Sequence, residues 1–253
     1  MRYFIELAYD GTLYHGWQIQ PNGVSVQGCI QSALGTLMHC GEMPILGAGR
    51  TDAGVHARFM VAHFDMEGET VDCRQLTYKL NKLLPPDISI FRIYPVPDDL
   101  HARFSAKSRT YHYLVHTRKN PFLRHRSCFL YLPTDFALMN QAASILMEYE
   151  DFTSFSKTGT QTATNLCRIT EAHWQPVAGS PLDDNGVPTE WRFAITANRF
   201  LRNMVRAIVG TLLMVGQGRM TIEGMRRVIE ARDRCTAGES VTGSGLYLVD
   251  IKY

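Results

Sequence analysis

The order of the first secondary-structure elements is set by residues 3–38, which read YFIELAYDGTLYHGWQIQPNGVSVQGCIQSALGTLM. Side chains alternate over Tyr3–Tyr9, as is typical of a strand, and Asp10-Gly11 favours a turn. After Ser25, a residue type that often caps helices, apolar side chains recur at helical spacing as far as Met38. The stretch therefore predicts a strand, a loop and a helix.

The first half of the chain continues this pattern. Residues 44–46 are short and apolar, a glycine-rich segment follows, and residues 59–64 predict a strand. Asp72 is expected to cap a helix that Pro85-Pro86 stops, and residues 88–94 predict a further strand. The order is β-α-β-β-α-β, a ferredoxin-like pattern.

The second half repeats the order in longer form. Strands are expected at residues 111–115, 169–174, 191–196 and 246–251, and helices after Thr134 or Asp135, around 201–212 and after Thr221. We expect an α+β protein. Its two ferredoxin-like lobes, residues 1–104 and 105–253, would merge their antiparallel sheets around a central cleft.

Composition excludes several classes of protein. The chain has 253 residues, 45% of them hydrophobic and 20% charged, which fits a compact globular protein. The longest uncharged apolar run, residues 207–215, is too short to span a bilayer, and the first residues do not resemble a secretory signal, so we expect a cytoplasmic protein. The six cysteines are widely spaced, which predicts reduced thiols and no metal site.

Basic residues are concentrated in two stretches that contain no Asp or Glu, although the net charge is only +2. These stretches are residues 100–134 and 191–222. Arg outnumbers Lys 20 to 6, and the planar guanidinium suits phosphates and base edges. An RNA or DNA partner and a solvated basic face without a partner both fit this pattern.

The most unusual segment is GAGRTDAGVHA, residues 47–57. It is not a P-loop, because Val55-His56 stand where Lys and Ser or Thr belong, nor a dinucleotide fingerprint, because Asp52 replaces the third glycine. A two-metal nuclease would need carboxylates from elsewhere in the chain to converge on Asp52. A tight turn, with Asp52 capping backbone amides and Arg50 as a surface charge, is a further interpretation.

A carboxylate beside a guanidinium can also act as a nucleophile. Cleavage of the C1′–N bond of a nucleoside fits such a group. Because no second carboxylate stands near Asp52 in the sequence, the two-carboxylate route of ordinary glycosidases is less natural than a rearrangement that returns the same base.

Residues 49–56, GRTDAGVH, resemble the signature of the TruA family of tRNA pseudouridine synthases. Further segments stand in the family's order, so that the resemblance covers nearly the whole chain. They are Tyr9-Asp10-Gly11, Tyr14–Gln18, Val26-Gln27, His101–Ala106, Tyr111-His112-Tyr113, Asp151–Phe155, Asn203–Gly210 and Gly245–Leu248.

The resemblance implies the pseudouridine synthase fold and a homodimeric enzyme. This enzyme would isomerise uridine to pseudouridine in the anticodon stem-loop of tRNA, at positions 38, 39 and 40, with no metal or organic cofactor. It makes Asp52 the nucleophile, with Arg50 helping to open the site and hold the flipped nucleotide. It also implies that Tyr111 stacks on the target base, that Arg206 pairs with the catalytic carboxylate and that Leu246 forms an apolar wall.

Further side chains border these positions. Arg103, Arg109 and Arg202 are expected to contact the substrate. The spacing of Arg199, Arg202 and Arg206 predicts that they share one face of a helix. We assign no catalytic role to His56 or His101, and His15-Gly16-Trp17 is either a turn with a half-buried indole or part of the RNA surface.

Two other functions remain open at this point. An RNA-binding protein with a vestigial site would bind in a salt-dependent way without modifying a base. A metal-dependent nuclease would cut the strand until a chelator is added.

Overall fold

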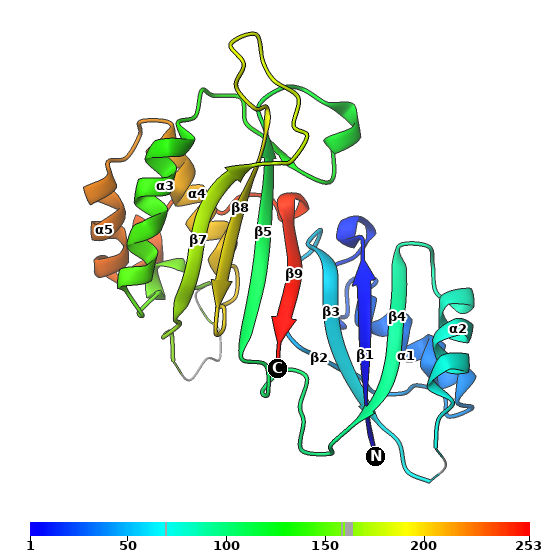
Figure 1. The fold of residues 1–253 in the computed structure, drawn as a ribbon. Helices are drawn as coiled ribbons and strands as arrows, with labels where there is room; N and C mark the ends of the chain where they lie inside the picture. Colours follow the sequence, from blue (N-terminus) through cyan, green and yellow to red (C-terminus); the bar gives the residue numbers. More distant parts are fainter. Residues whose placement is uncertain (69, 158, 160–163) are drawn as a thin grey trace. The chain divides into compact units, whose positions relative to one another are not determined.

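The computed structural model describes residues 1–68, 70–157, 159 and 164–253 (Figure 1). It divides into two compact units, residues 1–107 with 247–253 and residues 108–246. Each unit combines a sheet with helices, which confirms the expected α+β class.

The first unit contains a sheet in the strand order β4-β1-β3. Its strands β1 (Arg2–Tyr9), β3 (His56–Asp65) and β4 (Ile88–Val96) are antiparallel. The short β2 (Leu46–Gly47) pairs antiparallel with residues 62–63 of β3, which completes the ferredoxin-like order 4-1-3-2. Strand β9 (Leu246–Lys252) runs parallel to residues 56–57 of β3, so the sheet is mixed rather than purely antiparallel.

Two helices of the first unit pack against each other, and the second of them packs on β4. Helix α1 (Val26–Leu37) begins after Ser25, whose hydroxyl accepts from the backbone N–H of Gly28. Helix α2 (Cys73–Leu83) begins after Asp72, which accepts from the N–H of Gln75. Both predicted caps are therefore confirmed, and each satisfies an amide that has no partner within its helix.

The second unit contains a sheet in the strand order β5-β8-β7. Strands β5 (Ser108–His116), β8 (Glu190–Ala197) and β7 (Ile169–Pro176) are antiparallel, and the short β6 (Cys128–Phe129) runs parallel to the end of β5. Its helices are α3 (Phe136–Ser144), α4 (Met204–Gly216) and α5 (Ile222–Ala231). Asp135 and Thr221 cap α3 and α5, as predicted.

Short 3₁₀ helices, which the sequence patterns did not predict, occur in both units. They are η1 (Gly11–Leu13), η2 (Pro121–Leu123), η3 (Ile145–Glu148), η4 (Thr153–Phe155), η5 (Arg234–Thr236) and η6 (Gly243–Gly245). Within the described residues, no helix is long and apolar enough to cross a membrane.

The predicted helix around residues 201–212 begins later than expected. Asn203, the residue before α4, has a φ of 66°, in the left-handed region that interrupts a right-handed helix. Arg199 and Arg202 therefore precede α4, and only Arg206 lies on it. The prediction that the three arginines share one helical face is wrong.

His63 is the most deeply buried titratable side chain on β3, with an exposed fraction of 1%. Its Nδ1 accepts from the backbone N–H of Ala102 at 3.2 Å, and its ring packs edge-on against His101. Burial lowers the pKa of His63 to about 4, and the positive charge of Arg2 acts in the same direction. The folded protein thus holds His63 neutral.

This burial predicts a pH-dependent stability. An exposed histidine in the unfolded chain has a pKa near ~6.5. As the pH falls, the unfolded state therefore takes up a proton before the folded state does. The contribution of His63 to the free energy of unfolding is fully present above pH ~6.5 and is lost as the pH falls to ~4. The loss is at most about 3 kcal/mol.

Denaturant unfolding at several pH values tests this expectation. His63→Gln keeps an acceptor but does not titrate, so its stability should fall less steeply than that of the wild type between pH ~6.5 and ~4. Above pH ~7, where His63 is neutral in both states, the two proteins should show the same pH dependence. Equal slopes for His63→Gln and the wild type would show that His63 does not contribute.

Candidate active site

Residues 48–55 form the loop between β2 and β3. The backbone N–H of Ala48 donates to the carbonyl of Val61 at 2.8 Å, which fixes the start of the loop. The N–H of Val55 donates to the carbonyl of Asp52 at 3.2 Å, and Gly54 has a φ of 73°. Asp52 therefore lies, partly exposed, at the start of a tight turn directly before β3.

The end of β1 and the segment that follows it hold this loop through hydrogen bonds. The hydroxyl groups of Tyr9 and Thr51 lie 2.9 Å apart and are buried. The N–H of Trp17 donates to the carbonyl of Thr51 at 3.2 Å, and the N–H of Gly54 donates to the carbonyl of Tyr14 at 3.3 Å. The backbone is thus held on both sides of Asp52.

Two glycines allow the close approach of these segments. A Cβ on Gly11 would lie 2.0 Å from the carbonyl oxygen of Val55, and one on Gly16 would lie 2.2 Å from that of Thr51. Gly16 also has a φ of 89°, a conformation that favours glycine. Any larger residue at either position would force the two segments apart.

The structure shows how His15-Gly16-Trp17 is arranged. Trp17 is only 3% exposed, so its indole is more deeply buried than the half-buried ring considered as one interpretation of the sequence. The indole also lies close to Gly47, because a Cβ on Gly47 would lie 2.5 Å from the ring. His15 is exposed. Gly16 and Trp17 therefore support the Asp52 loop, a role that sequence patterns did not reveal because it depends on backbone contacts.

His56 and His101 both use a ring nitrogen to accept from the backbone. His56 Nδ1 accepts from the N–H of Gly11 at 3.1 Å, and the ring stacks on Tyr247 at 4.5 Å. His101 Nδ1 accepts from the N–H of Arg103 at 3.0 Å. Both rings therefore contact the backbone of the first unit, and His56 Nδ1 also lies 3.1 Å from the Asp10 carboxylate.

The first unit also carries two of the arginines singled out from the sequence. Arg50 stands two residues before Asp52 in the same loop, and its side chain is exposed. Arg103 is exposed as well, and its guanidinium lies 5.3 Å from the centre of the Phe104 ring.

In the second unit, Arg109 and Tyr111 lie on one face of β5, because alternate strand residues share a face. Arg109 donates through Nη1 to the carbonyl of Asn198 at 3.0 Å. The half-buried Tyr111 ring packs edge-on against Phe200, with ring centres 5.1 Å apart. The edge contact fixes the plane of the Tyr111 ring.

Arg206 lies in the first turn of α4 and holds the segment that leads to Leu246. Its Nε donates to the carbonyl of Val241 at 2.7 Å, and the hydroxyl of Tyr113 donates to the carbonyl of Thr242 at 3.0 Å. Leu246 itself is 6% exposed. Tyr113, to which the sequence patterns assigned no role in the site, therefore positions the same segment as Arg206.

The chain is similar to known proteins over its whole length. Residues 142–253 match the family model described as tRNA pseudouridine synthase. The chain is 55% identical over 252 residues to tRNA pseudouridine synthase A of Bacteroides thetaiotaomicron, with all of this chain and 90% of that protein covered. It is 40% identical over 255 residues to tRNA pseudouridine synthase A of Streptococcus thermophilus, with all of this chain and 99% of that protein covered.

The chain belongs to the tRNA pseudouridine synthase family. The resemblance carried by residues 49–56 and the segments in family order is thereby confirmed. As a member of the family, the protein is an enzyme of the isomerase class, and its α+β structure agrees with the expected pseudouridine synthase fold.

The enzyme distributes its candidate site residues over both units. One loop of the first unit brings Arg50 and Asp52 together, while Arg103 follows β4. The second unit holds the remaining five on or beside β5, α4 and the start of β9: Arg109, Tyr111, Arg202, Arg206 and Leu246.

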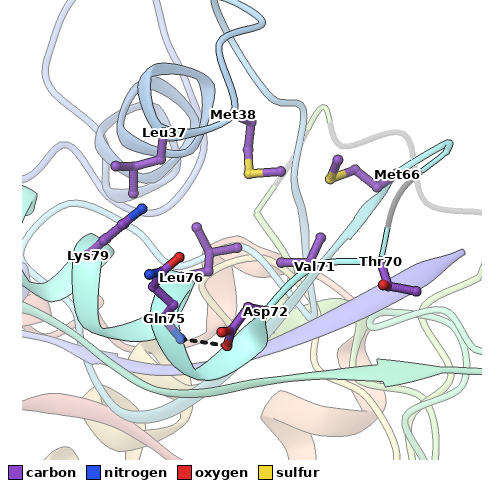
Figure 2. A pocket seen from close by; sticks show the side chains of 9 residues that line it. All are labelled: Leu37, Met38, Met66, Thr70, Val71, Asp72, Gln75, Leu76 and Lys79. Carbon is purple, nitrogen blue, oxygen red and sulfur yellow. Dashed lines mark hydrogen bonds between the residues drawn. The ribbon is translucent and has the colours of Figure 1, made fainter.

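A pocket of about 210 Å³ lies elsewhere in the first unit of the enzyme (Figure 2). It is formed by the end of α1, by Met66 and residues 70–72, and by the start of α2, with Met38 and Met66 on one side and Leu76 on the other. The candidate site residues do not line it. Among the residues that the structure describes, no group of three or more His, Cys, Asp or Glu side chains could hold a metal ion.

The contact between Gly16 and Thr51 leads to a prediction about the stability of the enzyme. Gly16→Ala should lower the free energy of unfolding by about 2–4 kcal/mol, because the new Cβ adds backbone strain and a clash. The melting temperature should fall by about 5–15 °C.

Gly49→Ala in the same loop is the matched control. Nothing lies within 4 Å of a Cβ built on Gly49, and its φ is not positive. Calorimetry should find it close to the wild type. A Gly16→Ala protein as stable as Gly49→Ala would contradict the close approach.

Proposed function

We propose that this enzyme converts uridine to pseudouridine in the anticodon stem-loop of tRNA, at positions 38, 39 and 40, with Asp52 as the nucleophile. The single observation that carries the proposal is the turn that holds Asp52, fixed on both sides by backbone hydrogen bonds to Tyr14 and Trp17. A fixed and partly exposed carboxylate is suited to attack on a bound nucleotide.

The reaction balances without a cofactor. The bond between C1′ and N1 breaks, the uracil turns, and a bond forms between C1′ and C5. The proton that leaves C5 goes to solvent, and N1 takes up a proton, so the product is an isomer of the substrate. In this scheme Asp52 forms a transient covalent bond with either the sugar or the base.

The other residues receive roles that their surroundings support. A uridine in a stem-loop must leave the stack before Asp52 reaches it. The exposed Arg50 would hold the flipped nucleotide, and Tyr111, its ring plane set by Phe200, would stack on the base. Arg206 would pair with the Asp52 carboxylate, and Leu246 would form the apolar wall of the pocket.

Binding of the rest of the substrate would rest on charge. Arg103 and Arg202 are exposed, and Arg109 is half-buried at the start of β5. We assign all three to contacts with the RNA backbone, which give affinity but do not read sequence.

We also propose that the enzyme is cytoplasmic and homodimeric, with domains at residues 1–104 and 105–253. The compact units of the structure depart from these bounds at residues 105–107 and 247–253. Light scattering of the purified protein would test the dimer independently of the chemistry.

Asp52→Asn should abolish turnover and leave tRNA affinity within about threefold of the wild type, because binding rests on phosphate and stacking contacts. The protein is incubated in EDTA with an unmodified tRNA transcript that carries uridines at positions 38 to 40. Pseudouridine is then mapped by carbodiimide adducts and reverse-transcription stops.

Asp99→Asn, which removes an exposed carboxylate elsewhere in the first unit, is the control and should keep full activity. Stops in the Asp52→Asn reaction equal to those of the wild type would contradict the assignment of the nucleophile. Salt-sensitive binding with no stops in the wild type would favour the RNA-binding protein, and EDTA-sensitive strand cleavage would favour the nuclease.

A further inference from the structure

We infer that the loop between β5 and β6, residues 117–127, is a second contact surface for the tRNA, away from the reacting uridine. The inference rests on the proposed function, since it assumes that Tyr111 stacks on the target base. It concerns a segment to which the reaction itself assigns no role.

The composition of this β5–β6 loop fits RNA. It contains four exposed basic side chains and an exposed aromatic ring, and neither it nor its flanks from residue 100 to 134 contain an acid. The basic residues are Arg118, Lys119, Arg124 and Arg126. Between them stands Phe122, with 86% of its surface exposed.

The loop is ordered by its own hydrogen bonds. Asn120 Oδ1 accepts from the N–H of Phe122 at 3.0 Å, which starts the 3₁₀ helix η2. The carbonyl of Leu123 accepts from the N–H groups of Arg126 and Ser127 at 3.0 and 3.1 Å. The backbone on both sides of Phe122 is therefore fixed, so the ring is presented to solvent at a low conformational cost on binding.

The two ends of the loop are also held together. Strand β6 pairs with the end of β5, and His116 Nδ1 lies 3.0 Å from the Ser127 hydroxyl in a buried contact. The His116 ring stacks on Phe129, which packs on Tyr131, and Tyr131 is 83% exposed. A second exposed aromatic ring thus follows the β5–β6 loop on a rigid base.

The neighbouring acidic residues do not cancel this charge. The connection between β7 and β8, drawn in yellow in Figure 1 near the green β5–β6 loop, carries Asp183 and Asp184. Asp183 Oδ1 accepts from the N–H groups of Asn185 and Val187, within its own turn. Glu190, which pairs with His116 across the strands, is the third acid at this end of β5. The four basic side chains of the loop outnumber these three acids.

The length of β5 places the β5–β6 loop at a distance from Tyr111, the tyrosine proposed to stack on the target base. Tyr111 and Thr117 stand six residues apart along an extended strand, which places the loop about 20 Å from the stacking tyrosine. A contact there reaches RNA several nucleotides from the flipped base. Arginine and lysine would bind phosphates, and Phe122 would pack on an unstacked base or a ribose.

Binding of unmodified tRNA to loop variants of the full-length protein tests the inference. Phe122→Ala should raise the Kd by about fivefold or more. The triple variant Arg118→Gln, Lys119→Gln, Arg124→Gln should reduce the slope of log Kd against log salt by about two to three. The single-turnover rate at saturating enzyme should stay within about twofold of the wild type, because the loop does not touch the reacting uridine.

Helix α2 supplies matched controls, because it also exposes one aromatic and three basic side chains. Tyr78→Ala and the triple variant Arg74→Gln, Lys79→Gln, Lys82→Gln should leave the Kd and the salt slope close to wild type. Equal losses of tRNA affinity in the loop variants and the α2 variants would show that net charge alone causes the effect, and would overturn the inference.

Unchanged tRNA binding by the loop variants would also overturn it, and a fall in oligomeric mass in those variants would assign the loop to a protein interface instead. Failure of this inference can be distinguished from failure of the proposed function. A wild type that forms no pseudouridine, but whose tRNA affinity depends on Phe122, would retain the RNA contact and reject the proposed reaction.

Discussion

The close contact of two backbone segments, Gly16 against Thr51 and Gly11 against Val55, determines where Asp52 lies. No side chain fits between the segments, since a Cβ at either glycine would meet a carbonyl oxygen at about 2 Å. Because backbone hydrogen bonds also join the segments, the Asp52 turn is held by the core of the first unit rather than by flexible side chains. Such preorganisation is what attack by a carboxylate on a bound nucleotide requires.

The second unit uses a related arrangement for the segment before Leu246. Arg206 on α4 and Tyr113 on β5 each donate to a backbone carbonyl of this segment, at Val241 and Thr242. A helix and a strand therefore set its path together. Arg206, which we propose pairs with the Asp52 carboxylate, thus also has a structural role. A substitution of Arg206 would therefore both remove a charge and displace Leu246.

The sequence predicted elements where the signal is local and missed what depends on contacts distant in the chain. Ser25, Asp72 and Thr221 cap their helices as expected, because capping involves only the next three residues. The start of α4 was misplaced because nothing in its apolar spacing reveals the left-handed conformation of Asn203. The support that Gly16 and Trp17 give to the Asp52 loop was likewise invisible, since it joins residues more than thirty positions apart. Asp52 and Arg50 were found from a short motif because both lie in one loop.

The central claim, that Asp52 carries out the covalent step, is tested most directly by loss of the hydrogen at C5 of the target uracil. A tRNA labelled with tritium at this carbon releases the label when C5 bonds to C1′. The account predicts that the wild type releases one tritium for each uridine converted, and that Asp52→Asn releases none while still binding the tRNA. Release by Asp52→Asn at the wild-type rate would contradict it.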